Sequence, residues 1–567
     1  MERKPCSAAS WINLLIVKKA PLMGACPAES AIQQYLRHHK LDWLIIPRED
    51  EFLGEAVPSY NERLAWATGF TGSAGIAVIS PTTAHLFVDG RYTLQANQET
   101  TGIIIHRMSE LWEWASLTFN PKDVIGLNLK FHTQGFLQKL QTIPCTIRHL
   151  DPHPVDMLWA DRPSVNLSLV RPHPLPYSGE TTPSKLERIL STLAPEAEAL
   201  YVQDPHDVAW ALNIRGQDLP YTPIALARAL IWKNGDVQLF LNHADVSAEV
   251  RQYLGNNVNI SPMHAIDEAL LKPQRLQMDP NVSAYDRQRL GDKAIIQASP
   301  IVLMKAIKNA VEIEGMRQAH RWDAEAVCKF RNWLRSETPM HLDEIKSAQT
   351  LEDFRQQCPA YTGPSFPTIS EFGPNGAVVH YHATPKTNRT FEANGLYLVD
   401  SGGQYLEGTT DITRTFAIGN PTAEYRHAYT LVLKGHLRLA NAVFPKGTTG
   451  HQLDALARFD LWQAGLNYDH GTGHGVGSYL SVHEGPHSIS PRANGVALQP
   501  GMVVSNEPGY YKAGEFGIRI ENMMVVQESA HDGFLRFETL TKVPYEAELI
   551  DESLLSAAEI DWIARET

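Results

Sequence analysis

The stretch Leu396-Tyr-Leu-Val-Asp400-Ser-Gly-Gly403 is the most informative segment of this 567-residue chain. Its apolar run leads directly into Asp400, and such a run is typical of a strand buried on both faces. Asp411 follows Gly408-Thr-Thr410, which is consistent with an adjacent strand reached through a hairpin. An aspartate before serine and glycine is more often a turn residue than a ligand. The pair therefore has to be judged together with the segments downstream.

Three downstream segments place polar residues in similar settings. They are His470-Gly-Thr-Gly-His474-Gly-Val-Gly477, Ser505-Asn-Glu507-Pro-Gly509 and Gly517-Ile-Arg-Ile-Glu521. Glycines on both sides of His474 allow a close approach of the backbone. In the third segment, strand alternation directs Arg519 and Glu521 to one face, although a surface ion pair would produce the same pattern. Each element is weak alone, but together and in this order they indicate one site.

These segments supply two aspartates, one histidine and two glutamates: Asp400, Asp411, His474, Glu507 and Glu521. Four carboxylates in one pocket would repel each other and hold protons unless cations were present. Two divalent ions would carry the charge that four carboxylates neutralise. Oxygen-rich ligands with a single imidazole favour Mn, Co, Fe or Zn over a thiolate-type structural zinc. The sequence therefore predicts a dinuclear metal site.

Composition limits the classes of protein to consider. A length of 567 residues predicts two to four domains, and 43% hydrophobic with 20% charged residues is ordinary for a soluble globular protein. The formal net charge of −13, without a basic cluster, argues against nucleic-acid binding. The five cysteines are scattered and form no CxxC pair, which favours free thiols in a reducing compartment. We expect a cytoplasmic protein that does not bind membranes.

The N-terminal residues allow more than one interpretation. The apolar run Trp11–Val17 is cut off by Lys18 and Lys19, well short of a membrane span. Gly24-Ala-Cys26 faintly resembles a lipoprotein cleavage site, but the lysines interrupt the apolar core of a signal peptide. The other interpretation is an upstream start codon, with the working chain beginning near Met23.

The chain divides by composition into several parts. A helix at 32–39 and a strand at 42–47 open a compact α/β unit, and a second unit with a similar order of elements opens with a helix at 186–193 and the strand Ala199–Val202. Prolines recur between the two units, as expected for a semi-rigid connector. A long amphipathic pattern, including Val311, Met316, His320 and Val327, then opens a third unit. The predicted parts are an extension at 1–25, domains at 26–160 and 185–310, a Pro-rich linker at 161–184, and a catalytic domain at 311–567.

His483-Glu-Gly-Pro-His487 matches the HExxH pattern of zinc metalloproteases, which works only on a helix. Gly485 and Pro486 oppose a helix, since proline in a helix interior costs about 3 kcal/mol. His483 is more useful as a lone imidazole beside the metals, and His380 is a similar candidate; a hydrogen-bonded core histidine is the alternative for both. The sequence contains no GxSxG elbow, P-loop or dinucleotide fingerprint.

The combined motifs resemble those of metallopeptidases with the pita-bread (creatinase/methionine aminopeptidase) fold, and in particular cytosolic-type Xaa-Pro aminopeptidases. Further segments carry the resemblance: Phe372-Gly-Pro-Asn-Gly376, Gly72-Ser-Ala-Gly75, Asp89-Gly-Arg91-Tyr92 and Asn213-Ile-Arg-Gly-Gln-Asp218. It covers the chain from about residue 28 onward. It implies an α/β (α+β) protein with two ribonuclease-H-like N-terminal domains and a C-terminal pita-bread domain. Such proteins are Mn-dependent homodimers that remove the N-terminal residue of peptides with proline second.

The resemblance also implies roles for individual residues. The metal ligands would be Asp400, Asp411, His474, Glu507 and Glu521. The catalytic groups would be Glu507 as proton shuttle, with His483 and His380 binding the substrate and the developing oxyanion. The remaining substrate contacts would be His470 at the proline pocket, His474, Arg519 beside Glu521, and Arg91 of the first domain.

Three rival functions stay open. A prolidase, which cleaves Xaa-Pro dipeptides, shares the fold and ligands but generally has one N-terminal domain. Some pita-bread domains are non-catalytic binding modules that have lost metal ligands. Creatinase-like hydrolysis without metal is the third. The complete ligand set disfavours the last two.

Overall fold

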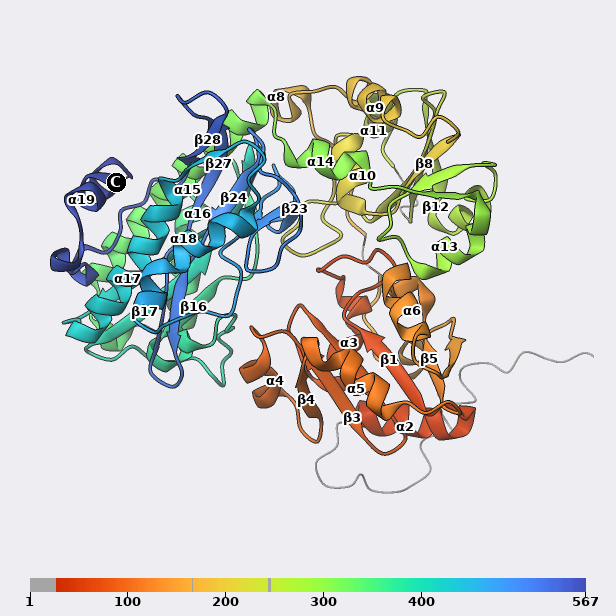
Figure 1. The fold of residues 1–567 in the computed structure, drawn as a ribbon, viewed down its shortest axis with the longest axis horizontal. Coiled ribbons are helices and arrows are strands. Elements are labelled where there is room, and N and C mark those ends of the chain that lie inside the picture. The colour runs from red at the N-terminus through yellow and green to blue at the C-terminus, as the bar shows by residue number, and fades with distance from the viewer. Residues whose placement is uncertain (1–26, 166, 243–245, 567) are drawn as a thin grey trace, which may run out of the picture.

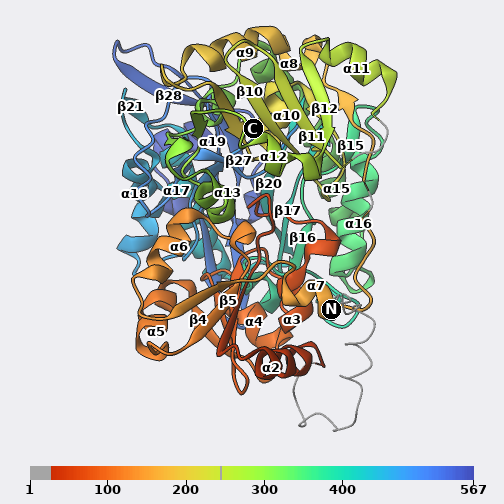
Figure 2. The ribbon, with the colours of Figure 1, turned by 90° about the vertical axis from the view of Figure 1, so that its right-hand side faces the viewer.

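The computed structural model describes residues 27–165, 167–242 and 246–566, and these form three α/β units (Figure 1). Two units of similar size lie together, and the larger C-terminal unit lies against both. Figure 2 shows the second unit above the first when the molecule is turned. The expected extension at 1–25, including Cys6 and the apolar run, lies outside the described residues. Within the described ranges no helix has the length and apolarity that a membrane crossing requires.

The first unit is built on one six-stranded sheet. Its strands, in spatial order, are β4 (Ile104–Arg107), β3 (Ala84–Val88), β2 (Gly75–Ile79), β1 (Trp43–Pro47), β5 (Val124–Leu127) and β6 (Thr146–His149). Its helices are α2 (Pro27–His39), α3 (Arg63–Thr68), α4 (Thr93–Glu99), α5 (Leu111–Thr118), α6 (Gln134–Gln141) and α7 (Pro154–Leu158). Strand β1 and its neighbours are almost wholly buried, so apolar side chains on both faces hold helices against the sheet.

The second unit repeats the topology of the first. Its strands, in order, are β12 (Val258–Pro262), β11 (Val237–Leu241), β10 (Ala227–Trp232), β8 (Ala199–Val202), β13 (Leu276–Met278) and β14 (Ala294–Ile296). Its helices are α9 (Thr182–Ser191), α10 (Pro205–Ala211), α11 (Ala248–Leu254), α12 (Ile266–Ala269), α13 (Ala284–Leu290) and α14 (Pro300–Ala306). In both sheets the second and third pairings, in the order given, are antiparallel, and the other three are parallel. The similar order of elements predicted for the two units therefore corresponds to a shared sheet topology.

The Pro-rich segment between the two sheets is not free of structure. It contains β7 (Arg171–Pro172) and the short helix α8 (Leu175–Ser178). Strand β7 pairs with β9 (Ile214–Arg215) of the second unit. This pairing attaches the end of the connector to the second unit.

The C-terminal unit opens with the long helix α15 (Ala310–Ser336). Asn309 caps it, because its side chain accepts from Val311 N and Glu312 N while Glu312 bonds back to Asn309 N. Met316, His320 and Val327 are buried as the pattern predicts, but Val311 is 40% exposed. Val311 lies in the first turn of the helix, on the side that faces away from the buried Glu312.

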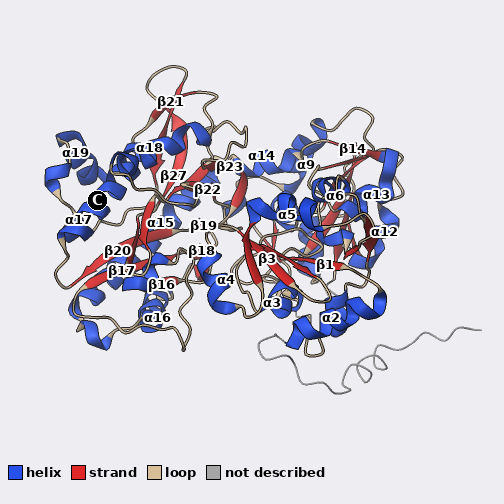
Figure 3. Ribbon diagram, turned by 60° about the horizontal axis from the view of Figure 1, so that its bottom comes forward, coloured by secondary structure: helices blue, strands red, loops and turns tan. Residues whose placement is uncertain are grey.

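Strands of the C-terminal unit form two main sheets, covered by helices (Figure 3). The three-stranded sheet has the order β16 (Ile369–Phe372), β17 (Gly395–Ser401), β20 (Ile412–Ile418). The six-stranded sheet has the order β21 (Val443–Pro445), β28 (Phe534–Thr539), β27 (Asn522–Glu528), β24 (Val503–Asn506), β22 (Gly473–Gly475), β23 (Glu484–Ile489). Two small sheets pair β15 (Tyr361–Pro364), β18 (Gly403–Tyr405) and β19 (Gly408–Thr409), and β25 (Gly509–Lys512) with β26 (Phe516–Arg519). The helices are α15, α16 (Glu344–Arg355), α17 (Ala423–Ala440), α18 (Gly450–Gln463) and α19 (Ala557–Glu566).

Candidate metal centre

One cavity of about 1140 Å³ brings together every site residue that the sequence predicts. Its lining includes Arg91, His380, Asp400, Asp411, His470, His474, His483, Glu507, Arg519 and Glu521. Residues of all three units contribute to its walls, for example Glu55 from the first unit and Tyr221 from the second. The cavity is thus a property of the assembled chain rather than of the C-terminal unit alone.

Two antiparallel strands place the aspartates. Asp400 lies one residue before the end of β17, and its register partner on β20 is Thr413. Asp411 immediately precedes β20, so the pairing brings both carboxylates to the same edge of the sheet. Thr413 Oγ1 also donates to Glu521 Oε2 at 2.8 Å. The hairpin-like arrangement predicted for the two aspartates is present, with β18 and β19 inserted between the strands.

Strand alternation places Glu521 as predicted. Strand β26 ends at Arg519, yet the backbone continues so that Ile518 and Ile520 both enter the core and are fully buried. Arg519 and Glu521 consequently face the cavity, and each is 1% exposed. One ligand atom each from Asp411, His474 and Glu521 lies within 4.8 Å of the others, close enough to hold a metal ion.

His474 lies on β22 between two glycines whose backbones are tightly packed. A Cβ at Gly473 would lie 2.0 Å from Ser505 O, and one at Gly475 would lie 2.1 Å from Glu484 O. Side chains at these positions would push β22 away from its neighbours. The strand holds His474 Nε2 at 3.5 Å from both Asp411 Oδ2 and Glu507 Oε1.

The carboxylate oxygens of the centre suit cations. Asp400 Oδ1, Asp411 Oδ1 and Glu521 Oε1 are buried and have no hydrogen-bond partner among the described residues. Burial, and then the neighbouring carboxylates, raise the pKa values of Asp411 and Glu521 well above their ordinary range. Buried acceptors without partners are rare, and two bound divalent ions would satisfy both their lone pairs and their charge. The residues present therefore fit a dinuclear metal centre.

Arg519 orients a potential ligand. Its Nη2 donates to Asp400 Oδ2 at 2.7 Å, and its Nη1 donates to the Tyr511 hydroxyl at 2.8 Å. Its Nε bonds Thr413 Oγ1 at 3.2 Å. Three hydrogen bonds fix the Arg519 guanidinium, which in turn fixes the Asp400 carboxylate through Oδ2. Oδ1 of Asp400 is not used in this hydrogen bond.

Two of the predicted histidines are held by tyrosines. His380 Nδ1 lies 2.8 Å from the hydroxyl of Tyr92, a residue of the first unit. His470 Nε2 lies 2.9 Å from the Tyr511 hydroxyl, and its Nδ1 lies 2.8 Å from Gly471 O. Burial lowers the pKa of His380 well below its usual range and that of His470 to about 3. Both imidazoles are therefore neutral near pH 7.

His483 stands opposite the centre and contacts the first unit. Its ring lies 4.4 Å from that of His474, centroid to centroid. Its Nδ1 lies 2.9 Å from Glu55 Oε2, and both side chains are about 40% exposed because they face the cavity. Loss of water around Glu55 inside the cavity would by itself raise its pKa, but the His483 imidazole, followed by Arg91, holds this pKa below its ordinary value. Glu55 is therefore a carboxylate near neutral pH.

Arg91 is the predicted residue most loosely connected to the metal ligands. It pairs with Asp89, with Arg91 Nη2 at 2.6 Å from Asp89 Oδ2. Its side chain faces the same cavity, on the side formed by the first unit.

Sequence reasoning missed Glu55, Tyr92 and Tyr511. Tyr92 is the last residue of the segment Asp89-Gly-Arg91-Tyr92, and Tyr511 lies two residues after Glu507-Pro-Gly509, but neither was assigned a role. Glu55 has no comparable signal, because it lies in an irregular segment that contacts His483 only across the folded chain.

The residues that match the HExxH pattern do not form the helix that a zinc site of that type requires, as predicted. Residues Glu484–Ile489 form strand β23 rather than a helix. His487 Nε2 bonds Val503 O at 2.7 Å within the sheet, and His487 does not line the cavity.

Comparison with known proteins gives matches along nearly the whole chain. The model of metallopeptidase family M24 matches residues 314–528, and a C-terminal region of the same peptidase type matches 533–565. The creatinase/prolidase N-terminal domain matches twice, at 30–152 and 161–312.

Individual relatives cover the chain equally well. Aminopeptidase P1 of Lotus japonicus is 36% identical over 94% of each chain. A probable Xaa-Pro aminopeptidase P of Laccaria bicolor is 37% identical over 94% of this chain and 88% of its own. Among solved structures, X-prolyl aminopeptidase from Caenorhabditis elegans has a TM-score of 0.89 at 32% identity, covering 93% of this chain and 90% of its own. An Xaa-Pro dipeptidase from Bacillus anthracis has a TM-score of 0.54 at 26% identity, covering 65% of this chain and 99% of its own.

Proposed function

Because the chain belongs to metallopeptidase family M24, we propose that it is a metal-dependent Xaa-Pro aminopeptidase, which releases the first residue of peptides whose second residue is proline. The same matches confirm the predicted fold, with two creatinase-type N-terminal units and a C-terminal pita-bread unit. The observation that carries the proposal is the convergence of the five candidate ligands on one cavity. Three of their buried carboxylate oxygens have no hydrogen-bond partner in the part of the chain that the structure describes.

We propose that Asp400, Asp411, His474, Glu507 and Glu521 hold two divalent ions. The C. elegans enzyme is described as having a di-nuclear active site, which supports two ions here. Oxygen-rich ligands with one imidazole support Mn²⁺ as the native ion, with Co²⁺, Zn²⁺ or Fe²⁺ as alternatives. When bound, such ions acidify water and polarise a peptide carbonyl.

The chain's own residues supply the proton transfers. The proline amide bond has no N–H, and its ring nitrogen must be protonated as it leaves. Glu507 lies beside His474 and is the candidate for carrying this proton. His483 and His380 line the same cavity, so their N–H groups are candidates for donating to the oxygen on which charge develops.

The two ends of the substrate are recognised by different units. His470 and Tyr511 form a neutral, ring-lined surface that suits the proline side chain. Glu55 is an ionised carboxylate at the cavity, and a free peptide N-terminus is a cation. We propose that Glu55 binds this ammonium group, and that Arg91 contacts the substrate at another part of the same cavity.

Prolidase is the second candidate, and the size of the chain argues against it. The B. anthracis dipeptidase is aligned over 99% of its own length but only 65% of this chain. The second unit of this chain contributes Tyr221, Thr222 and Lys305 to the cavity walls. A non-catalytic binding role is disfavoured because no candidate ligand is missing.

The test is hydrolysis of Arg-Pro-Pro against Arg-Pro after chelation and restoration of Mn²⁺. Metal-dependent release of arginine from the tripeptide, with little from the dipeptide, is the expected result. Preference for the dipeptide would move the assignment to prolidase. No turnover of either peptide with any first-row metal would favour the binding module.

We also propose domain limits of 26–160, 185–310 and 311–567, which follow the three units described above, although α9 begins at Thr182 and α15 at Ala310. The connector at 161–184 belongs with the second unit through the β7–β9 pairing. A cytoplasmic homodimer is proposed from the family resemblance, and the C. elegans relative is described as cytosolic. Limited proteolysis and sedimentation equilibrium test these assignments.

A further inference from the structure

The loop that carries His483 is held by side chains of the second unit. Arg215, which is 5% exposed, donates from Nε to Tyr479 O at 2.7 Å and from Nη2 to Ser478 O at 3.2 Å. Its Nη1 donates to Ala209 O at 3.0 Å and to Ile214 O at 2.9 Å within its own unit. One guanidinium therefore ties α10 and β9 of the second unit to the start of the loop 478–484.

The other end of the loop is tied by an ion cluster. Glu484, the residue after His483, accepts a hydrogen bond from Lys308 and lies 3.7 Å from Lys305 Nζ. Lys305 Nζ also lies 3.0 Å from Asp207 Oδ1 on α10. All four side chains are at most 6% exposed. Buried charges that are paired in this way hold their geometry, because losing one partner leaves another charge buried and unpaired.

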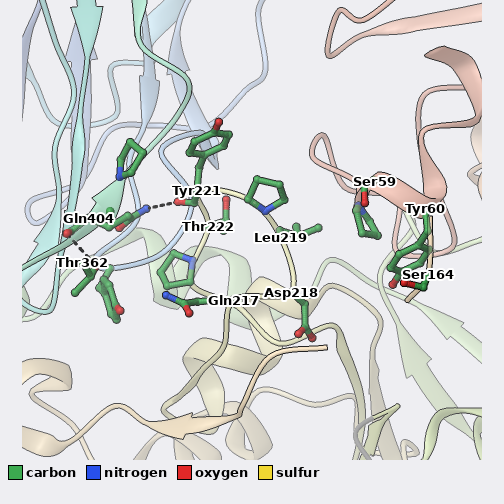
Figure 4. Close-up of a pocket in the computed structure, with 16 residues that line it drawn as sticks. Ser59, Tyr60, Ser164, Gln217, Asp218, Leu219, Tyr221, Thr222, Thr362 and Gln404 are labelled. Atoms are coloured by element: carbon green, nitrogen blue, oxygen red, sulfur yellow. Dashed lines mark hydrogen bonds between the residues drawn. The ribbon is translucent and has the colours of Figure 1, made fainter. Parts of the chain in front are cut away.

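The middle of the loop is fixed at the joint of the three units, which encloses a second cavity of about 530 Å³ (Figure 4). Gln404 Nε2 bonds Leu480 O at 2.8 Å and Tyr221 O of the second unit at 3.0 Å. Tyr479 has a φ of +49°, an uncommon backbone conformation for a residue other than glycine. Such a conformation is strained and persists only where surrounding contacts impose it.

From these contacts we infer that Arg215 is a positioning residue for His483. The second unit sets the loop so that the imidazole faces His474, and Arg215 acts through the loop without touching the substrate. This inference rests on the role proposed above for His483. It assigns a catalytic purpose to Asn213-Ile-Arg-Gly-Gln-Asp218, a motif that the metal centre does not use. A purely structural role for Arg215 is the competing explanation, and the tests below separate the two.

The variant Arg215→Lys keeps the charge but has no planar fork to bridge α10 and the loop. We expect kcat for Arg-Pro-Pro to fall about 10- to 100-fold, the scale of a misplacement of about 1 Å, with both metals retained. The decisive measurement repeats the substitution in a His483→Ala background. If Arg215 acts through His483, the second substitution should then lower kcat by less than about twofold.

The matched control is Arg355→Lys. Arg355 is fully buried and forms a two-pronged bond to Asp323, with Nε at 2.8 Å from Oδ1, but it lines neither cavity. This variant should lower thermal stability and leave kcat of the metal-loaded enzyme unchanged. A loss of kcat as large as that of Arg215→Lys would overturn the inference.

Hydrogen–deuterium exchange gives a test that does not depend on turnover. In Arg215→Lys, amides of the segment 478–484 should exchange faster, while those of 395–418 should not change. Glu484→Gln, which weakens the other tie, should produce the same local effect and serves if Arg215→Lys fails to fold. Unchanged exchange rates in the segment 478–484 would refute the inference that Arg215 holds this loop in place.

The kinetic outcomes separate two failures. If His483→Ala leaves kcat unchanged, the proposed role of His483 is wrong, and the inference falls with it. If His483→Ala lowers kcat but Arg215→Lys lowers it by the same factor in both backgrounds, only the positioning role is refuted.

Discussion

The metal-free protein should lose stability as pH rises. Asp411 and Glu521 have ordinary pKa values of 3.8 and 4.5, and burial followed by the neighbouring carboxylates raises both in the folded chain. Above the ordinary values, the folded state therefore binds more protons than the unfolded state. Its free energy of unfolding then falls with pH until pH passes the raised pKa values.

The magnitude follows from linkage. Each carboxyl that is protonated only in the folded state lowers the free energy of unfolding by about 1.4 kcal/mol per pH unit. For a unit of about 250 residues this corresponds to about 3–5 °C in melting temperature per pH unit and per group. Bound divalent ions replace the protons, so the metal-loaded protein should lack this decline. The stabilisation by metal should therefore grow with pH.

The assay is thermal unfolding of chelated and Mn²⁺-loaded protein between pH 5 and pH 8 at constant ionic strength. The difference between the two sets of melting temperatures cancels the contribution of groups that titrate equally in both forms. Asp411→Asn together with Glu521→Gln should flatten the decline in the metal-free protein.

Glu546→Gln is the control, because burial also raises the pKa of Glu546, which pairs with Arg335 outside the cavity. It should leave the difference between the forms unchanged. Parallel pH dependences of chelated and loaded wild-type protein would refute the reasoning, since the carboxylates would then not exchange protons for metal.

Three substitutions test separate parts of the site. His483→Ala should lower kcat about 10²-fold or more with metal content unchanged, the scale of a lost transition-state donor; unchanged kcat, or lost metal by elemental analysis, contradicts that role. Asp411→Ala should abolish metal loading and activity together, so an active, fully metallated variant would remove Asp411 from the ligands. Glu55→Gln should raise KM for Arg-Pro-Pro about 10- to 100-fold, since a charge-assisted hydrogen bond contributes about 1.5–3 kcal/mol. An N-acetylated peptide should lose the same binding energy, and equal KM values for variant and wild type would exclude Glu55 as the amine site.

Local patterns were sufficient to select the candidate metal ligands that the fold brings to one cavity. Asp400 and Glu521 follow apolar or alternating segments whose side-chain directions depend only on strand geometry, so their faces could be derived from spacing. The glycines beside His474 likewise reported close backbone contacts, which the structure shows at Ser505 O and Glu484 O. Strand β26 ends at Arg519, two residues before Glu521, yet the alternation of side-chain faces continues to Glu521.

What the sequence by itself determined was therefore the set of candidate ligands, the similar α/β order of the first two units and the family. These depend on short spacings and on the chemistry of individual residues. Only the tertiary structure showed that Glu55 reaches His483 across 428 positions and that Tyr92 reaches His380 across 288. It alone showed that Arg215 holds the loop of His483 from another unit. These contacts join irregular segments whose relative positions depend on how three separate cores pack together, and no periodicity along the chain encodes that packing.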